Sequence, residues 1–151
     1  MDRSEQDIAY MQMALALARE AAEADVVPVG ALVVFRDRVI AAARNRRETD
    51  KLATHHAEIV AIEEACRVRG GWRLPDCTLY VTLEPCPMCA GAIVNARVPR
   101  VVFGAYDPRA GAFGSAVDFN TLGLNHRPEI TGGVLGEECA AVLREYFRKK
   151  R

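Results

Sequence analysis

The sequence predicts an α/β protein in which helices cover both faces of one mixed, five-stranded sheet, a three-layer α/β/α sandwich. Two observations predict it. Short apolar runs rich in β-branched residues recur along the chain, and segments with helical periodicity alternate with them. The length of 151 residues, with 50% hydrophobic and 26% charged residues, fits one folded domain over residues 1–151 with a sizeable core.

The first helix is expected over residues 4–24. Its apolar side chains form one stripe, which consists of Ile8, Met11, Leu15, Ala18 and Ala22. Ser4 and Asp7 stand at capping-box spacing at its start. Two β-branched runs follow at residues 29–35 and 39–43, and the short polar segment between them predicts a hairpin.

The remaining elements alternate between helix and strand. A polar loop leads into a second helix that runs to about Arg69, with Thr54 as its expected cap and Gly70 as its stop. Pro85 forces an extended entry into a third helix that begins near Cys86. The other expected elements are strands at residues 78–83, 100–105 and 129–135, the last of them weak, and a closing helix at residues 137–150.

The clearest chemical signal lies in two short segments, His-Ala-Glu at residues 56–58 and Pro-Cys-Pro-Met-Cys at residues 85–89. A tetrahedral zinc site needs neighbouring soft donors, and two thiols three residues apart at the start of a helix provide them. We therefore expect His56, Cys86 and Cys89 to bind one Zn²⁺ per chain. Three protein ligands leave a fourth position open, which is typical of catalytic zinc sites.

Glu58 would stand beside that open position. Zinc lowers the pKa of a bound water, and a carboxylate within hydrogen-bond reach can take the proton and pass it to a leaving group. Both segments would present helix N-termini to the metal, where thiolates are favoured over thiols. This arrangement suits the hydrolytic removal of an amino group from an sp² carbon, with Glu58 as the catalytic residue.

A Cys-x-x-Cys pair alone also occurs in structural zinc sites and in redox pairs. A structural Cys₄ site would need a second such pair, which Cys66, Cys77 and Cys139 do not form. A redox pair would leave His56 and Glu58 unexplained. The combined pattern, H-x-E followed by P-C-x-x-C, is the known signature of zinc deaminases and favours the catalytic interpretation.

Beyond this signature, the sequence resembles the bacterial tRNA-specific adenosine deaminases over nearly its whole length. The resemblance rests on residues 28–31, 45, 56–58, 79–86, 88–92, 101–105, 111–115 and 125–126. It implies the cytidine-deaminase-like fold, a tRNA anticodon stem-loop as partner, and a homodimer. The implied reaction converts adenosine to inosine at the wobble position, by attack of zinc-activated water on C6 of a flipped adenine while Glu58 moves the protons.

The same resemblance implies a set of substrate contacts. Asn45 would bind the target nucleotide, because its amide is both donor and acceptor, although a loop-capping asparagine is the alternative. Asp107 would accept a hydrogen bond from a ribose 2′-OH that DNA lacks, so DNA is not an expected partner; a turn-forming aspartate is the alternative. The expected substrate-binding residues are Asn45, Val29, Ala57, Pro85, Asp107 and Phe147.

Two positions depart from the family pattern. His55 precedes the expected ligand where relatives carry a small residue, and Arg44 precedes Asn45 where they tend to carry an aromatic residue or histidine. We expect His56 rather than His55 to be the ligand, because His56 stands two residues before Glu58. Both departures bear on the shape of the pocket.

Charge balance limits how the chain can meet RNA. The 20 basic and 20 acidic residues give zero formal charge, so contacts with RNA must be local. Candidate basic patches are Arg44, Arg46, Arg47 and Lys51 in one loop, Arg97 and Arg100, and residues 148–151. A solvated face is the alternative for each patch, and it is the better one for the terminal run taken alone.

The five cysteines fit a reducing cytoplasm better than a disulfide framework, and neither a signal segment nor a membrane-spanning stretch is recognisable. We therefore expect a cytoplasmic protein without a membrane partner.

Other functions stay open. A free-base guanine or nucleoside deaminase would suit the same motifs, although residues 101–115 favour the tRNA enzyme. A non-catalytic, zinc-stabilised RNA-binding module would be expected to lack the carboxylate of Glu58. The small, apolar segment at residues 90–100 is the candidate dimer interface, and a buried core helix is an equal alternative.

Overall fold

The computed structural model describes residues 1–150 of the chain, and its five strands form one sheet in the order β2-β1-β3-β4-β5. The strands are β1 (Gly30–Phe35), β2 (Arg38–Arg44), β3 (Cys77–Leu83), β4 (Arg100–Ala105) and β5 (Glu129–Thr131). β1 pairs antiparallel with β2 and β3, whereas β4 runs parallel to both β3 and β5. The sheet is therefore mixed and five-stranded, as predicted.

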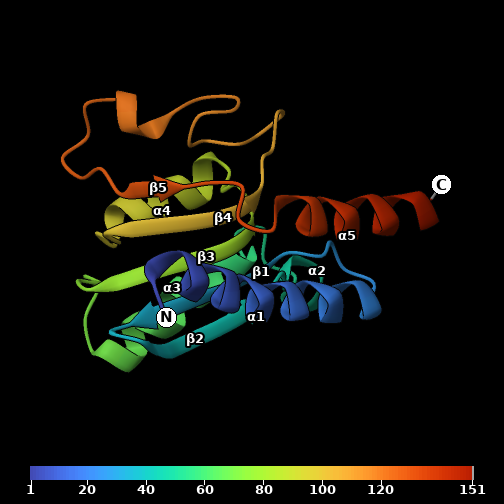
Figure 1. Cartoon of the computed structure of the whole chain (residues 1–151), viewed down its shortest axis with the longest axis horizontal. Helices are drawn as coiled ribbons and strands as arrows, with labels where there is room; N and C mark the ends of the chain where they lie inside the picture. The colour runs from blue at the N-terminus through green and yellow to red at the C-terminus, as the bar shows by residue number, and fades with distance from the viewer. Residues whose placement is uncertain (151) are drawn as a thin grey trace.

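Helices cover both faces of this sheet (Figure 1). α1 (Arg3–Glu23) and α5 (Gly136–Lys149) contact each other on one face, and α3 (Ala57–Arg69) and α4 (Pro87–Asn95) contact each other on the opposite face. A short helix α2 (Arg47–Asp50) and a 3₁₀ turn η1 (Phe119–Thr121) interrupt the loops. Within residues 1–150, none of the helices combines the length and apolar character needed to cross a membrane.

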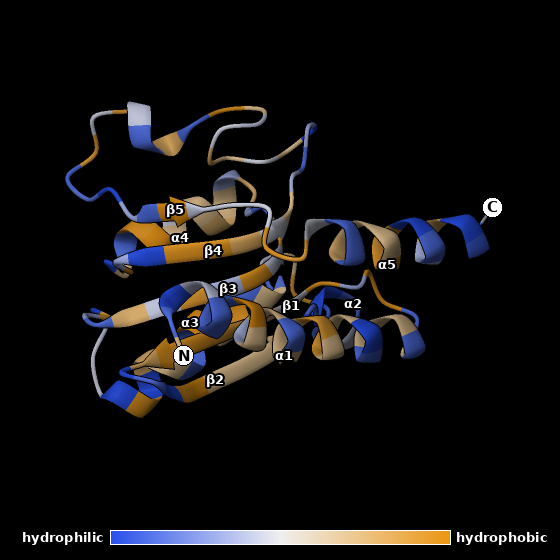
Figure 2. Ribbon diagram, in the orientation of Figure 1, coloured by the Kyte–Doolittle hydropathy of each residue, from blue (hydrophilic) through white to orange (hydrophobic). Residues whose placement is uncertain are grey.

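Alternation along the strands divides the core between the two faces. On β3, Leu79 and Val81 pack with residues of α3 and α4, whereas Tyr80 packs with residues of α1. Figure 2 shows the resulting pattern, in which apolar strands lie between helices with mixed surfaces. Because β3 and β4 are covered on both faces, they are apolar on both, which explains their strong strand signal.

Two predicted boundaries and one predicted loop differ from the structure. Thr54 does not cap α3, because His56 occupies the N-cap position with an extended backbone. β5 ends at Thr131 instead of continuing to residue 135, and Gly133 follows with a positive φ of 85°. The polar loop before α3 contains the short helix α2.

The start of α1 also differs from the prediction. Asp2 rather than Ser4 caps the helix, with its Oδ1 accepting from the Glu5 N–H at 2.8 Å. Met11, Leu15 and Ala18 of the predicted stripe are buried, whereas Ile8 is 40% exposed and Ala22 is only partly buried, so the buried stripe differs from the predicted one at its two ends. Its buried apolar members are Met11, Ala14, Leu15, Ala18 and Ala21.

Arg100, named in a candidate basic patch, has a side chain that is only 11% exposed and is held in an ion pair. Its guanidinium donates to both carboxylate oxygens of Asp7, at 2.8 and 2.7 Å, and Tyr80 donates its hydroxyl to the same carboxylate at 2.7 Å. Asp7, expected at a capping box, is instead 5% exposed. This buried ion pair joins α1 to β4.

Candidate metal centre and its cavity

The predicted metal ligands lie at the starts of two helices. His56 is the N-cap of α3 and Cys86 is the N-cap of α4, and neither side chain makes a capping hydrogen bond. Pro87 occupies the first helical turn, where its missing N–H costs nothing. Both side chains are therefore free to turn away from their own helix towards a shared ligand.

The three ligand atoms are spaced as a tetrahedral metal site requires. His56 Nδ1 lies 3.7 Å from Cys86 Sγ and 3.6 Å from Cys89 Sγ, and the three atoms all lie within 4.8 Å of one another. Normal zinc–sulfur and zinc–nitrogen bonds at tetrahedral angles separate N and S ligands by about 3.6 Å. The two nitrogen–sulfur distances therefore fit a shared zinc ion.

The electrostatics of the group favour a thiolate. A hydrogen bond from Cys89 and another from His56 lower the pKa of Cys86 to about 4, although burial opposes this. The same contact with Cys86, together with burial, raises the pKa of Cys89, and the hydrogen bond with Cys86 raises the pKa of His56. A metal ion would take the place of the protons that these three groups share.

Glu58 lies in the first turn of α3 and is only 4% exposed. Burial is the main reason that the pKa of Glu58 is raised to about 7. A carboxyl group that titrates near neutrality can both accept and release a proton during one reaction. The geometry thus agrees with the proton-transfer role predicted for it.

A cavity of about 160 Å³ opens onto these residues. Its lining includes His56, Glu58 and Cys86 from the predicted centre and the predicted substrate contacts Val29, Asn45, Ala57 and Asp107. The other lining residues are Val27, Leu83, Glu84 and Ala110. The segment before β1, the residue after β2, the start of α3, the end of β3 and the loop after β4 therefore converge on one site.

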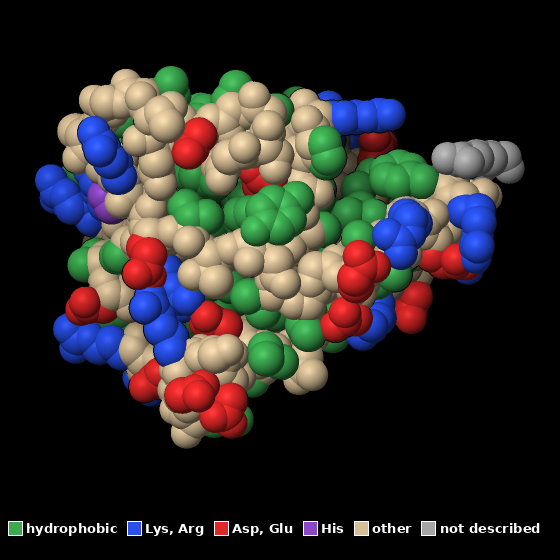
Figure 3. Space-filling view, turned by 45° about the horizontal axis from the view of Figure 1, so that its top comes forward, with side chains coloured by type: hydrophobic (Ala, Val, Ile, Leu, Met, Phe, Trp, Pro, Cys, Tyr) green, Lys and Arg blue, Asp and Glu red, His purple; other side chains and the backbone are tan. Residues whose placement is uncertain are grey.

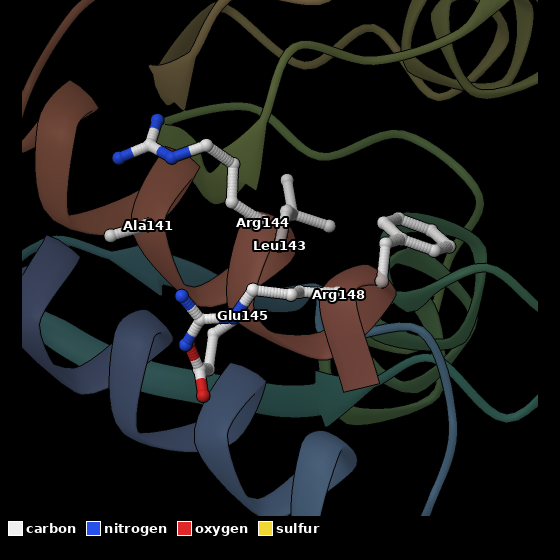
Figure 4. Close-up of a pocket in the computed structure, with 6 residues that line it drawn as sticks. Ala141, Leu143, Arg144, Glu145 and Arg148 are labelled. Carbon is white, nitrogen blue, oxygen red and sulfur yellow. The ribbon is translucent and has the colours of Figure 1, made fainter. Parts of the chain in front are cut away.

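Two predicted substrate contacts lie elsewhere. Pro85 is buried beside the site, where its carbonyl accepts from the Ala112 N–H at 2.8 Å, but it is not among the lining residues. Phe147 is 47% exposed on α5 and lines a separate shallow groove along that helix. Figure 4 shows this groove, with Arg144 and Arg148 among its labelled side chains. Phe147 thus lines a different pocket from the predicted metal centre.

Asn45 and Asp107 each stabilise a turn as well as lining the cavity. Asn45 Oδ1 accepts from the Arg47 N–H at 2.9 Å, which leaves its amide NH₂ as the group available to a ligand. Asp107 Oδ1 accepts from the N–H groups of Arg109 and Ala110, at 3.1 and 3.2 Å. The turn-forming alternatives are observed, and they are compatible with ligand contact through the remaining polar atoms.

His55 points to a different partner from His56. Its Nδ1 lies 2.8 Å from Asp50 Oδ2, and Arg46 also pairs with Asp50. His55 is not in the candidate metal group, which supports His56 as the ligand. Part of the predicted basic loop is therefore neutralised locally, whereas Arg44 carries a buried nitrogen with no hydrogen-bond partner in residues 1–150.

Glu84 is a residue of the site that the sequence patterns did not single out. The residue is 2% exposed, lines the cavity, and accepts hydrogen bonds from the loop after β4. The available signal was a charged residue at the end of a buried apolar strand, immediately before Pro85.

Comparisons with known proteins agree with this geometry. The model of the MafB19-like deaminase family matches residues 5–151. A tRNA-specific adenosine deaminase from Bacillus subtilis (strain 168) is 48% identical over 147 residues, which cover 97% of this chain and 91% of the relative.

Two solved structures are also similar. One, from structural studies of A-to-I editing by tRNA:A34 deaminases at the wobble position of transfer RNA, superposes with a TM-score of 0.86 and 45% identity, covering 89% of this chain and 99% of the other. A guanine deaminase from Nitrosomonas europaea superposes with a TM-score of 0.75 and 30% identity, covering 92% and 83%. Similarity is therefore highest, among these proteins, to those that edit tRNA.

Proposed function

Because the chain belongs to the tRNA-specific adenosine deaminase family, we propose that it converts adenosine to inosine at the wobble position of a tRNA anticodon. The observation that carries this proposal is the His56, Cys86 and Cys89 group, with ligand atoms within 4.8 Å of one another, at a cavity that buried Glu58 also lines. The chain that carries it is 48% identical to a tRNA-specific adenosine deaminase. The overall reaction replaces the C6 amino group of adenine with oxygen from water and releases ammonia.

His56, Cys86 and Cys89 would hold one Zn²⁺ per chain in this scheme. When bound, zinc lowers the pKa of water so that it can act as a nucleophile near neutral pH. The two cysteines supply negative charge and His56 a neutral donor, which leaves one coordination position for water. The cavity lies on the side of the group where Glu58 and Asn45 stand.

Glu58 would move the protons. Its carboxylate takes one proton from the attacking water and delivers it to the adenine ring nitrogen, while the C6–O bond forms. It then carries a second proton, from the hydroxyl now on C6, to the amino group, so that the C6–N bond breaks, the C6=O bond forms and neutral ammonia leaves. A pKa raised to about 7 by burial suits both steps, because neither protonation state is strongly favoured.

The small cavity would admit one unstacked base. Val29 and Ala57 form apolar walls, and the Asn45 amide NH₂ can donate to a base or ribose oxygen. A base inside a paired stem could not reach the metal group, so the target must be flipped or unpaired. An anticodon loop presents such bases.

Asp107 would favour RNA over DNA, because a ribose 2′-OH can donate to its carboxylate and deoxyribose cannot. Asp107 Oδ1 is already engaged by the turn, so Oδ2 is the oxygen available. We expect Asp107→Asn to narrow the ratio of kcat/KM between an RNA stem-loop and the matching DNA stem-loop. A ratio equal to that of the wild type would leave Asp107 with only its turn-forming role.

Ammonia release separates the candidate reactions. The purified enzyme is assayed with a transcribed tRNA, with free adenosine and with free guanine. Turnover of tRNA alone is expected. Turnover of guanine alone would support the runner-up, which the similarity to the Nitrosomonas europaea guanine deaminase makes a specific alternative. Zinc and RNA binding without any turnover would indicate a non-catalytic module.

A homodimer in the cytoplasm completes the proposal. Within the candidate interface segment, Ile93, Val94 and Val98 are buried in the chain itself, whereas Met88 and Ala92 on the same helix are only partly covered. The partly covered face of α4 is the part free for a second copy. Light scattering should give twice the chain mass of 16.6 kDa, and a monomer at micromolar concentration would contradict this.

A further inference from the structure

Strand β3 is followed by a carboxylate that the catalytic scheme does not use. Glu84 is 2% exposed and lines the same cavity as Glu58. Its own N–H donates to the carbonyl of Ala105 at 2.8 Å, at the end of β4. Because Pro85 and Cys86 follow directly, the residue connects the sheet to the start of the metal group.

The Glu84 carboxylate is surrounded by donors from one loop. Oε1 accepts from the Asp107 N–H at 3.0 Å and from the Ser115 hydroxyl. Oε2 accepts from the N–H groups of Phe113 and Ser115, at 3.1 and 3.2 Å. An ionised carboxylate only accepts hydrogen bonds, so its two oxygens match these four donors.

Gly111 lets the loop close around this carboxylate. A Cβ built at Gly111 would lie 2.3 to 2.5 Å from the carboxylate atoms of Glu84. Gly111 also donates its N–H to the Asp107 carbonyl at 2.8 Å and accepts from the Ala116 N–H at 2.9 Å. The loop is therefore folded on itself around Glu84, with space for hydrogen alone at position 111.

The enclosed loop supplies part of the cavity wall. Asp107 and Ala110 line the cavity, and residues 106–115 belong to none of the helices or named strands of the structure. Asp107 donates its N–H to Glu84, and its Oδ1 accepts from the Ala110 N–H. Both wall residues are thus tied to Glu84, one directly and one through Asp107.

We propose that Glu84 is a positioning residue for the deamination, which holds residues 106–115 as a preformed wall of the cavity before RNA binds. This proposal rests on the proposed function for the identity of the reaction. The wall itself is a property of the free protein. A wall that is ordered before binding lowers the free-energy cost of binding a flexible RNA loop. Loss of this order would therefore weaken RNA binding more than it slows deamination.

Glu84→Gln tests this with almost no change in shape. A glutamine side chain has one carbonyl oxygen and one NH₂ group. In either orientation its NH₂ faces at least one backbone N–H, that of Asp107 or those of Phe113 and Ser115. At least one buried donor then loses its acceptor, so the wall is expected to open more often.

Amide hydrogen exchange of the zinc-loaded protein without RNA is the first readout. Exchange at Asp107, Phe113 and Ser115 is expected to accelerate by about tenfold or more in Glu84→Gln, whereas exchange in the β1–β2 hairpin stays at the wild-type rate. Zinc content should remain one per chain. Unchanged exchange at these amides, or an equal acceleration throughout the fold, would overturn the proposal.

Steady-state kinetics with an RNA stem-loop is the second readout. KM is expected to rise by about tenfold while kcat changes little, because bound RNA restores the wall and Glu58 is untouched. A fall in kcat with an unchanged KM would overturn the positioning role. Hydrogen exchange needs no substrate, so failure of the tRNA assay in the wild type would reject the proposed function separately.

Two glycine variants provide a matched pair. Gly111→Ala should reproduce both effects by pushing the carboxylate away, whereas Gly71→Ala should leave both unchanged, because nothing lies within 4 Å of a Cβ there.

If Glu84→Gln does not fold, Ser115→Ala removes only one hydroxyl donor, and faster exchange confined to residues 106–115 is then the expected result. If a folded Ser115→Ala protein exchanged its amides at the wild-type rate, that result would count against the proposal.

Discussion

At the scale of single residues, the proposed proton transfer depends on Glu58. Glu58→Gln keeps the size and polarity of the side chain but cannot carry a proton. We expect kcat to fall by about 10²–10⁴-fold, while zinc content and RNA affinity stay close to those of the wild type. Deamination assays with an RNA stem-loop measure kcat, binding assays with the same RNA measure affinity, and metal analysis measures zinc content.

Glu64→Gln is the matched control, because Glu64 lies on the same helix with its side chain 53% exposed and paired with Arg67. Its activity should be unchanged. If Glu58→Gln turned over at the wild-type rate, Glu58 would have no part in proton transfer.

The two cysteines are expected to be required for zinc. A hydroxyl is a far poorer zinc ligand than a thiolate, so Cys86→Ser and Cys89→Ser should each lose the metal. Cys66→Ser is the control, because Cys66 is a free thiol outside the metal group. Elemental analysis of the purified proteins decides this, and full zinc occupancy in both variants would exclude these residues as ligands.

At the scale of the elements, the Asp7–Arg100 pair fastens α1 to the sheet. Burial opposes ionisation of Asp7, but hydrogen bonds from Arg100 and Tyr80 outweigh it and lower the pKa of Asp7 below its usual value. Removing one partner of a buried pair leaves the other charge uncompensated. We expect Asp7→Asn to lower the free energy of unfolding by about 3 kcal/mol at pH 7, measured by urea titration.

The pH dependence of the stability follows from the direction in which the pKa of Asp7 is shifted. A carboxyl whose pKa is lower in the folded state stabilises the fold above its unfolded pKa of about 3.9, and this contribution is lost as pH falls through the folded value. The difference between wild type and Asp7→Asn should therefore shrink below about pH 4. Asp76→Asn is the control, because the Arg36–Asp76 pair is exposed and worth little. Equal effects of the two substitutions would refute a special role for the buried pair.

At the scale of the whole molecule, α5 extends beyond the sheet (Figure 1). The last turn of this helix carries Arg148 and Lys149. Figure 3 shows basic and acidic side chains together along this end of the molecule. Arg148 and Lys149 pair with Glu145, and Lys150 pairs with Asp25, all at exposed positions. Such pairs are weak and can be exchanged for phosphate. Residue 151 lies outside the described residues.

Deleting residues 148–151 should therefore weaken RNA binding and reduce its salt dependence. The slope of the logarithm of the binding constant against the logarithm of salt concentration should fall by about 0.7 for each phosphate that the protein no longer neutralises. Phe147 remains in this variant, so any stacking on its exposed ring is retained. Arg67→Ala, at an exposed position on α3, is the control for removal of a surface charge. An unchanged RNA affinity and salt slope would mean that the terminal run is only a solvated surface with no role in RNA binding.

The sequence by itself determined the features that depend on neighbouring residues. An apolar run predicted β4 to the residue, because every residue of that strand after Arg100 is buried and apolar. The spacing of Cys86 and Cys89, with proline on either side of Cys86, predicted a helix start that presents two thiols together. The motif likewise selected His56 over His55, and the side chain of His55 turned out to pair with Asp50.

Only the tertiary structure decided which charged groups meet across the chain. Arg100 and Asp7 are 93 residues apart, and the loop donors around Glu84 lie 23 to 31 residues beyond it. Local patterns report the conformation of a segment and its buried face, because backbone sterics and periodicity act over a few residues. The partner of a buried charge depends on which faces the sheet brings together, and a buried carboxylate such as Glu84 is tolerated only where that folding supplies its donors.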